Sequence, residues 1–250
     1  MSLSEIAGST VIVTGASRGF GRGTATALAG AGARVVGLAR DGDALEKLGG
    51  ELGDSFIGVR GDATDPELAA ELLVRYEPRT VVLNAGANPV TRPIQEQTWD
   101  TFRNNWEVDV QQVFNWVRAA LRQPLAPGST VVSFSSAAAL RGSPLSGGYA
   151  GAKATVRFIS AYAAAESQDH KLGIRFLTVL PMLSPATDLG ANGAAAYAAA
   201  QGITTEAFVR GMGTILTPEK VGEAMVGLAA DPGLTHLAYL LMPDGLKPVQ

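Results

Sequence analysis

The stretch Thr10-Val-Ile-Val-Thr-Gly-Ala-Ser-Arg-Gly-Phe-Gly21 decides the fold. A short apolar run ends at Thr14, glycines follow in the spacing Gly-x-x-x-Gly-x-Gly, and a helical pattern begins. Glycines at a strand-to-helix turn let backbone N–H groups approach a pyrophosphate, whose charge the helix N-terminus favours. The spacing alone is a weak signal in a chain with 30 glycines, but its place at the first strand–helix junction predicts a dinucleotide-binding turn.

Six further apolar runs, each short and nearly continuous, alternate with helical patterns along the rest of the chain. They are Arg34–Ala39, Ser55–Val59, Thr80–Leu83, Thr130–Phe134, Ile174–Leu180 and Leu237–Met242. Such runs are typical of strands that are covered on both faces of a parallel sheet. We therefore predict an α/β protein with a Rossmann-like, doubly wound, seven-stranded and mostly parallel sheet, with helices on both faces and a single domain over residues 1–250.

Helix starts are visible at two places. Asp65-Pro-Glu67 and Thr217-Pro-Glu219 each combine a capping residue, a proline at the first helical position and an acid in the first turn. The stretch from Asp188 to Gly213 is too long for a simple connection, and its residues 194–200 are alanine except for Tyr197. It is either a helical excursion on the surface or a lid over a substrate pocket, and we take residues 183–213 as the lid segment.

The composition excludes several classes of function. A net charge of −3 offers no basic field for nucleic acid or anionic lipid. The apolar runs fall far short of the roughly 20 residues that a membrane span needs, and the first residues do not resemble a secretory signal. The absence of cysteine excludes disulfides and thiolate catalysis, and His170 and His236 have no metal-ligand spacing. We expect a cytoplasmic protein without a metal, a nucleic-acid partner or a membrane anchor.

The end of the second predicted strand bears on the choice of nucleotide. A site for NAD usually places an acid there to bind the ribose hydroxyls, but this chain has Ala39 followed by Arg40. Arg18 in the glycine turn is expected to approach the same place, and two guanidinium groups can hold a phosphate in a forked geometry. NADP(H) is therefore favoured. Asp41 and Asp43 lie just downstream and keep NAD(H) as the alternative.

Three residues form the predicted catalytic core. Tyr149 and Lys153 are four apart in a helical segment, so both side chains lie on one face of the helix. A free phenol titrates near pH 10, and a nearby ammonium favours the phenolate, which makes a tyrosine usable as a general acid and base. Ser136 follows the fifth predicted strand, where side chains face the ligand crevice, and it could hydrogen-bond a substrate carbonyl.

Together these motifs resemble the short-chain dehydrogenase/reductase family over essentially the whole chain. The resemblance rests on the glycine turn, Asp62, Asn84-Ala-Gly86, Ser136 and Tyr149-x-x-x-Lys153. It implies that Asp62 contacts the adenine and that Lys153 holds the nicotinamide ribose. The residues expected to bind the cofactor are Gly15, Ser17, Arg18, Gly19, Phe20, Gly21, Arg40, Asp62, Ala63, Asn84, Ala85, Gly86, Tyr149, Lys153, Pro181 and Thr187. The family also implies a homotetramer or homodimer, with interfaces on the helix bearing Tyr149 and on the helix from Thr98 to Leu121.

Two positions depart from the family pattern. Asp109 stands where the family usually has an asparagine whose backbone carbonyl holds a water of the proton relay, and we include Asp109 among the catalytic residues. Met182 stands where a glycine is expected, and its side chain would resist a positive φ.

Leu140, Leu145, Trp106 and the alanine-rich segment suggest an apolar pocket, although plain packing also explains such residues.

We therefore predict an NADP(H)-dependent oxidoreductase that moves a hydride between nicotinamide and a small-molecule carbonyl or secondary alcohol. Ser136, Tyr149, Lys153 and Asp109 are its predicted catalytic residues. The alternatives are an NADP(H)-binding regulator with weak catalysis, an NAD-dependent alcohol dehydrogenase, and an isomerase or dehydratase on the same fold.

Overall fold

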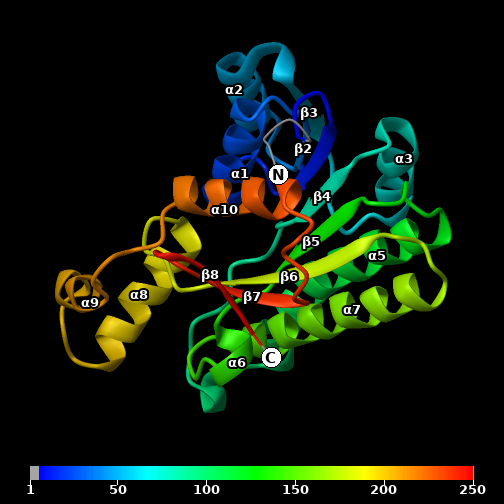
Figure 1. The fold of residues 1–250 in the computed structure, drawn as a ribbon. Coiled ribbons are helices and arrows are strands. Elements are labelled where there is room, and N and C mark those ends of the chain that lie inside the picture. Colours follow the sequence, from blue (N-terminus) through cyan, green and yellow to red (C-terminus); the bar gives the residue numbers. More distant parts are fainter. Residues whose placement is uncertain (1–5, 250) are drawn as a thin grey trace.

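The computed structural model describes residues 6–249, and one sheet runs through them in the order β3-β2-β1-β4-β5-β6-β7-β8 (Figure 1). Strands β1 to β7 pair in parallel, whereas β8 runs antiparallel to β7. The strands are β1 (Thr10–Thr14), β2 (Arg34–Ala39), β3 (Phe56–Arg60), β4 (Thr80–Leu83), β5 (Thr130–Phe134), β6 (Arg175–Pro181), β7 (Ala238–Met242) and β8 (Gly245–Pro248).

The predicted fold class is confirmed, with one correction to the strand number. Eight strands are described instead of seven, because the short segment Gly245–Pro248 turns back and pairs with β7 at the edge of the sheet. Its four residues include a glycine and a proline and are half-buried or exposed, so they carry no apolar run that predicts a strand. The third and sixth strands begin and end one residue later than predicted, and the seventh begins one residue later.

Helices cover both faces of the sheet in two layers (Figure 1). Leu28 of α1, Leu48 of α2 and Met225 of α10 belong to one apolar cluster, whereas α3, α5 and α7 contribute to the second. Side chains alternate along the strands, so that the clusters lie on opposite faces. The helices are α1 (Gly19–Gly30), α2 (Gly42–Leu52), α3 (Pro66–Tyr76), α4 (Trp99–Asn105), α5 (Gln111–Arg122), α6 (Ala138–Arg141), α7 (Tyr149–Asp169), α8 (Asp188–Ala200), α9 (Thr205–Gly211) and α10 (Pro218–Ala230), with short 3₁₀ turns at Gly53–Ser55 and Ile94–Glu96.

Both predicted helix starts are confirmed. The carboxylate of Asp65 accepts hydrogen bonds from the N–H groups of Glu67 and Leu68 at the start of α3. The hydroxyl of Thr217 accepts one from the N–H of Lys220 at the start of α10. These caps satisfy N–H groups that a helix leaves without a backbone partner.

The helix predicted from Thr98 to Leu121 is divided by a π-helical segment, η4 (Trp106–Val110). Such insertions widen one turn and are frequent at functional sites. Asp109 lies in this turn, and its side chain is buried. The π turn therefore positions the residue that departs from the family pattern.

The segment from Asp188 to Gly213 forms α8 and α9, which lie beside each other at one end of the molecule (Figure 1). Thr187 caps α8 and Thr204 caps α9. The rings of Tyr197 and Phe208 stack with their centroids 6.3 Å apart and hold the two helices together. Across the described part of the chain, no helix combines the length and the apolar character that a membrane span requires.

Candidate active site

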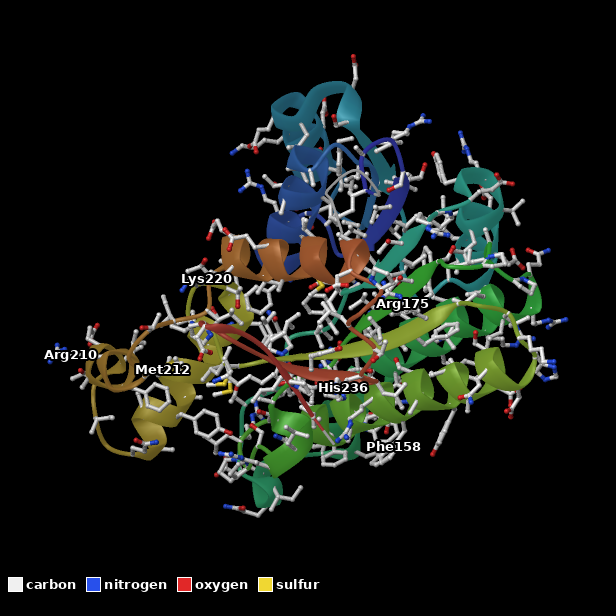
Figure 2. All side chains as sticks on the ribbon, viewed as in Figure 1. Phe158, Arg175, Arg210, Met212, Lys220 and His236 are labelled. Carbon is white, nitrogen blue, oxygen red and sulfur yellow. The ribbon has the colours of Figure 1, made fainter. Side chains whose placement is uncertain are left out.

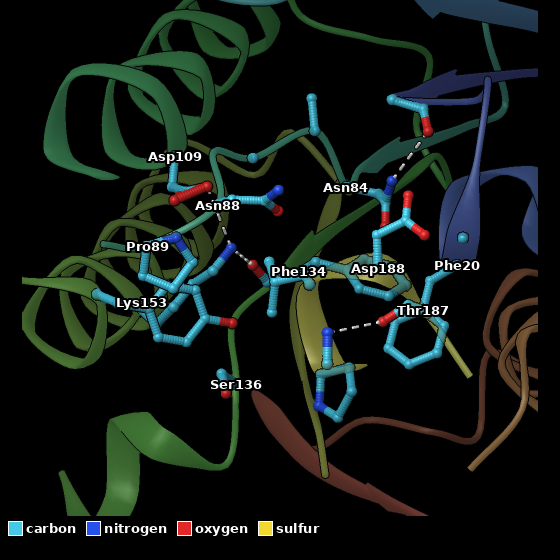
Figure 3. Close-up of a pocket in the computed structure, with 18 of the residues that line it drawn as sticks. Phe20, Asn84, Asn88, Pro89, Asp109, Phe134, Ser136, Lys153, Thr187 and Asp188 are labelled. Atoms are coloured by element: carbon cyan, nitrogen blue, oxygen red, sulfur yellow. Dashed lines mark hydrogen bonds and ion pairs between the residues drawn. The ribbon is translucent and has the colours of Figure 1, made fainter. Parts of the chain in front are cut away.

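A cavity of about 740 Å³ opens at the carboxyl ends of the parallel strands. It spans the point where the strand order reverses between β1 and β4, which is where doubly wound sheets bind their ligands. Its size lies within the range of small-molecule and cofactor sites. Figure 3 shows part of its lining, with Phe20 and Asp188 on one side and Lys153 on the other.

The glycine turn has the shape of a phosphate cradle. Gly15 has φ +68°, and a Cβ there would lie 2.9 Å from Cα of Ala85. Only a glycine therefore allows the turn to lie against β4. A Cβ on Gly21 would lie 2.1 Å from the carbonyl oxygen of Gly15. Gly21 does not line the cavity, because it lies behind the turn and lets α1 pack against it.

The start of α1 fits a pyrophosphate. No side chain caps this helix at Arg18, and its first turn contains no acidic residue. The first N–H groups of a helix have no partner within the helix, and Gly19 and Phe20, which begin α1, line the cavity. Uncapped N–H donors and the positive end of the helix dipole favour a bound anion. The residues present thus fit the phosphates of a dinucleotide.

A buried hydrogen-bond network holds the turn to the neighbouring strand. The hydroxyl of Thr14 donates to Oε1 of Gln112, 2.8 Å away, and accepts from the N–H groups of Asn84 and Ala85 at 3.0 and 3.1 Å. The side-chain amide of Asn84 donates to the carbonyl oxygens of Thr14 and Gly15. These bonds fix the distance between β1 and β4 at the centre of the cavity.

The far end of the cavity is lined by Arg40, Asp62 and Ala63, which follow β2 and β3. Asp62 accepts hydrogen bonds from the N–H and hydroxyl of Thr64. The backbone N–H of Thr64 is the main cause that lowers the pKa of Asp62 below its ordinary value, with smaller contributions from the Thr64 hydroxyl and Arg40. Asp62 is therefore a carboxylate in a preformed turn.

Arg18 also lines the cavity, where its guanidinium lies 3.5 Å from the carboxylate of Asp188 at the start of α8. Both side chains are exposed, so this pair adds little stability of its own. It does link the glycine turn to the first turn of α8 across the cavity mouth.

The predicted catalytic residues are brought together. Ser136, Tyr149 and Lys153 all line the cavity. The ammonium of Lys153 lies 5.7 Å from the centroid of the Tyr149 ring and donates to the carbonyl oxygen of Phe134 at 3.0 Å (Figure 3). Ser136 is half-buried, whereas the hydroxyl of Ser135 is turned away and donates to the backbone carbonyl of Lys153.

Asp109 completes this group with its side chain. Its carboxylate lies 3.6 Å from the Lys153 ammonium and accepts from the N–H of Ala87 and the amide of Asn105. Burial raises the pKa of Asp109 above its ordinary value, and the nearby Lys153 opposes that rise. The sequence drew attention to the backbone carbonyl at this position, but the carboxylate is the group that meets Lys153.

All predicted catalytic residues and every predicted cofactor residue except Gly21 line the cavity. Met182 lines it as well, and it is not among the non-glycine residues with positive φ, which in the described chain are Glu77 and Lys171. The family glycine can therefore be replaced there without backbone strain. Leu140, Leu145 and Trp106 do not line the cavity, so they do not form the apolar pocket that they suggested.

Several lining residues were missed in the sequence. Arg141 and Ser143 follow the fifth strand, and Tyr197 reaches the cavity from α8. The hydroxyls of Ser143 and Tyr197 share a short hydrogen bond, and Ser143 shares another with Ser146. The signal available was position, because Arg141 and Ser143 lie between Ser136 and Tyr149, in the connection that leaves the carboxyl end of the fifth strand.

Comparisons with known proteins agree with this geometry. A family model described as short chain dehydrogenase matches residues 9–197. Cis-4-hydroxycyclohexanecarboxylate dehydrogenase of Sinomonas cyclohexanicum is 31% identical over 245 residues, which cover 94% of each chain.

Two solved structures are also similar. One, from Beutenbergia cavernae, is described as an NAD(P)-dependent gluconate 5-dehydrogenase with bound NADP, and it has 26% identity, a TM-score of 0.75 and 89% coverage of each chain. The other, a 3-ketoacyl-(acyl-carrier-protein) reductase from Brucella melitensis complexed with NADH, has 23% identity and a TM-score of 0.75, and the match covers 93% of this chain and 95% of that one. The second likeness bears on the fold alone.

Proposed function

The chain belongs to the short-chain dehydrogenase/reductase family, and from that premise we propose that it reduces carbonyl compounds with NADPH. The family makes it an NAD(P)-dependent oxidoreductase that acts on an alcohol or carbonyl group. The observation that carries the proposal is the meeting of Ser136, Tyr149 and Lys153 in one cavity with an uncapped helix N-terminus.

The preference for NADP(H) rests on the residues at the adenosine end. Arg40 lines the cavity directly after β2, and Ala39 leaves no acid at that position to bind ribose hydroxyls. A guanidinium at this place suits the additional phosphate of NADP(H). Arg18 belongs to the glycine turn, whose Gly15 and Ala16 N–H groups bond to the end of β2, and it can turn from Asp188 to the same phosphate. The similar structures are described with either cofactor, so the preference depends on these arginines.

The chemistry is a reduction with one proton transfer. A bound nicotinamide would supply the hydride that the carbonyl carbon receives. Ser136 donates a hydrogen bond to the carbonyl oxygen and stabilises the charge that develops on it. Tyr149 then gives its hydroxyl proton to that oxygen, which completes the alcohol and leaves a phenolate that solvent reprotonates. In the reverse direction the Tyr149 phenolate takes the proton of the alcohol.

Lys153 and Asp109 set the electrostatics of this step. The ammonium of Lys153 faces the Tyr149 ring, where its positive charge can stabilise the negative charge that develops on the oxygen during proton transfer, and Lys153 is also assigned to the nicotinamide ribose. The carboxylate of Asp109 lies on the other side of the ammonium and offsets part of its charge. Asp109 is thus proposed to act through Lys153 as a positioning residue.

Residues 183–213 are proposed as the substrate-side lid of a single domain. Several residues of the stretch 183–193, together with Tyr197, line the cavity, whereas α9 does not. The lid contacts the rest of the site through Arg18 with Asp188 and through Ser143 with Tyr197. These polar contacts can break without disrupting the two apolar clusters that pack on the sheet.

A homotetramer or homodimer is proposed from the outer faces of α5 and α7. Val113 and Val117 pack on their own sheet, but Phe114 and Trp106 are exposed. Phe158 and Tyr162 on α7 are more than half exposed and stack on each other, and Phe158 points away from the helix (Figure 2). Exposed aromatic residues gathered on neighbouring helices are typical of subunit interfaces.

One observation favours a second candidate, a nucleotide-binding regulator with weak catalysis. The Asp109 carboxylate reduces the net charge beside Tyr149, which lowers the advantage that Lys153 gives to proton transfer. Against this candidate, a regulator would not require the complete set of Ser136, Tyr149 and Lys153.

The test follows absorbance of NADPH and, in parallel, NADH with a panel of ketones, aldehydes, 3-oxoacyl thioesters and 4-oxocyclohexanecarboxylate, the last chosen from the name of the Sinomonas relative. Turnover with NADPH at least tenfold more efficient than with NADH supports the proposal. Binding of NADPH without turnover of any carbonyl supports the regulator.

A further inference from the structure

The charges that line the cavity leave one cation without an assigned partner. The lining contains four cations and four carboxylates, namely Arg18, Arg40, Arg141 and Lys153 with Asp41, Asp62, Asp109 and Asp188. Arg18 pairs with Asp188, and Lys153 pairs with Asp109. Arg40 lies at the adenosine end, where it interacts with Asp62.

Arg141 is the last residue of α6, five positions after Ser136. It is exposed, and its guanidinium has neither a hydrogen bond nor an ion pair with any residue in the described range 6–249. A guanidinium in a ligand cavity without a protein partner is available for a ligand anion.

The remaining carboxylates lie too far from Arg141 to serve as partners. Asp41 and Asp62 follow β2 and β3, whereas Ser136 and α6 follow β5, which is three and four strands away in the sheet. At about 4.8 Å between strands, that separation is roughly 14 to 19 Å. None of the four lining carboxylates is therefore paired with Arg141.

The surroundings of Arg141 suit a polar group of a substrate. Ser143, two residues further on, shares a hydrogen bond with Tyr197 of the lid helix α8. The adjoining hydroxyl of Ser146 extends this chain toward Tyr149. These hydroxyls line the same cavity as Arg141 and can supply donors to a bound anion.

We propose that the substrate carries a carboxylate besides its reacting carbonyl or alcohol, and that Arg141 binds this carboxylate. The inference rests on the proposed function, because it presumes that the carbonyl lies between Ser136 and Tyr149. A planar guanidinium holds a carboxylate by two parallel hydrogen bonds, which fixes the orientation of the substrate as well as its affinity. The substrates are then oxo acids and hydroxy acids whose two functional groups are separated by several carbon atoms.

The test compares each oxo acid with its methyl ester, using 4-oxopentanoate and 4-oxocyclohexanecarboxylate, in the wild type, Arg141→Met, Arg141→Lys and the control Arg122→Met. Arg122 is exposed at the end of α5 and does not line the cavity. We expect the wild type to prefer the acid, and Arg141→Met to raise KM for the acid about 10- to 100-fold. KM for the ester should change less than twofold in Arg141→Met. Arg141→Lys should recover part of the loss with the acid, and Arg122→Met should match the wild type.

Binding gives a second readout that does not depend on turnover. Titration calorimetry of 4-oxopentanoate into the NADP⁺-loaded protein should show binding that Arg141→Met abolishes and that the ester lacks. Equal use of acid and ester, or an equal loss for both in Arg141→Met, overturns the carboxylate assignment while the proposed reductase function stands. Binding of the acid that depends on Arg141 without turnover of any carbonyl would support the assignment and contradict the reductase function.

Discussion

The carboxylate of Asp109 lies 3.6 Å from the ammonium of Lys153, and the two side chains are 1% and 6% exposed. An asparagine would fill the same space in the widened turn of η4 but would carry no charge. The buried pair therefore means that the cation beside Tyr149 is partly neutralised whenever Asp109 is ionised.

The first prediction concerns the pH dependence of alcohol oxidation in Asp109→Asn. The pKa of Asp109 is raised by burial, so as the pH falls through that pKa the carboxyl gains a proton and becomes neutral like asparagine. Wild type and variant should therefore behave alike in acid below that pKa and differ at pH values where Asp109 is ionised. With the full charge of Lys153 beside Tyr149, the variant should reach half of its maximal oxidation rate on the order of one pH unit lower than the wild type.

Glu107→Gln is the matched control, because Glu107 lies on the same π-helical segment but is exposed and pairs with Arg103. The pH at which Glu107→Gln reaches half of its maximal oxidation rate should equal that of the wild type. A higher midpoint in Asp109→Asn, or superimposable profiles, would contradict the role assigned to the carboxylate.

The second prediction concerns the choice of cofactor. Arg40→Ala should raise KM for NADPH about tenfold or more, because hydrogen bonds to charged groups contribute about 1.5–3 kcal/mol each. KM for NADH should change little, since NADH lacks the phosphate that Arg40 is assigned to bind. Arg22→Ala, which removes an arginine that pairs with Glu51 outside the cavity, should leave both values unchanged. Equal losses with the two cofactors would show that Arg40 does not discriminate between them.

The third prediction tests the network beneath the glycine turn. Thr14→Val removes the hydroxyl that links Gln112, Asn84 and Ala85 and should lower the free energy of unfolding by about 1–3 kcal/mol in urea titrations. Thr24→Val is a matched control, because the buried hydroxyl of Thr24 has no hydrogen-bond partner among the described residues. That variant should be neutral or stabilising, and similar losses in both would mean that the Thr14 bonds contribute no net stability.

The fourth prediction concerns assembly. Phe158→Glu combined with Tyr162→Glu places two charges on the outer face of α7 and should reduce the mass measured by light scattering to that of one chain. Val74→Glu, at another exposed apolar position on α3, should keep the mass of the wild type. If the wild-type protein is already a monomer, the proposed interface is wrong.

The sequence predicts the parts of this molecule that depend on local pattern. Tyr149 and Lys153 are fixed by one turn of helix and Ser136 by the end of a strand, so their meeting follows from the topology alone. The ion pair of Arg18 with Asp188 and the bond of Ser143 with Tyr197 join residues far apart in the chain. Such contacts depend on how α8 folds back over the crevice, which no periodicity in the sequence encodes.

Errors in the prediction have similar causes. β8 is stabilised by its pairing with β7 at the sheet edge, a tertiary effect that outweighs its weak strand propensity. Gly21 is assigned to the ligand because it belongs to the glycine motif, and the structure adds that it lets α1 approach the carbonyl of Gly15. Asp109 was recognised as a departure, yet only the π turn shows that its side chain reaches Lys153.

The central claim is that Tyr149 transfers the proton in an NADP(H)-dependent carbonyl reduction, and Tyr149→Phe tests it most directly. The variant keeps the ring that lies against Lys153 and removes only the hydroxyl. We predict that kcat/KM for the best carbonyl substrate falls about 100- to 10,000-fold, while Kd for NADPH, measured by fluorescence titration, stays within about twofold of the wild-type value. Undiminished turnover in Tyr149→Phe, with the cofactor bound normally, would contradict the account.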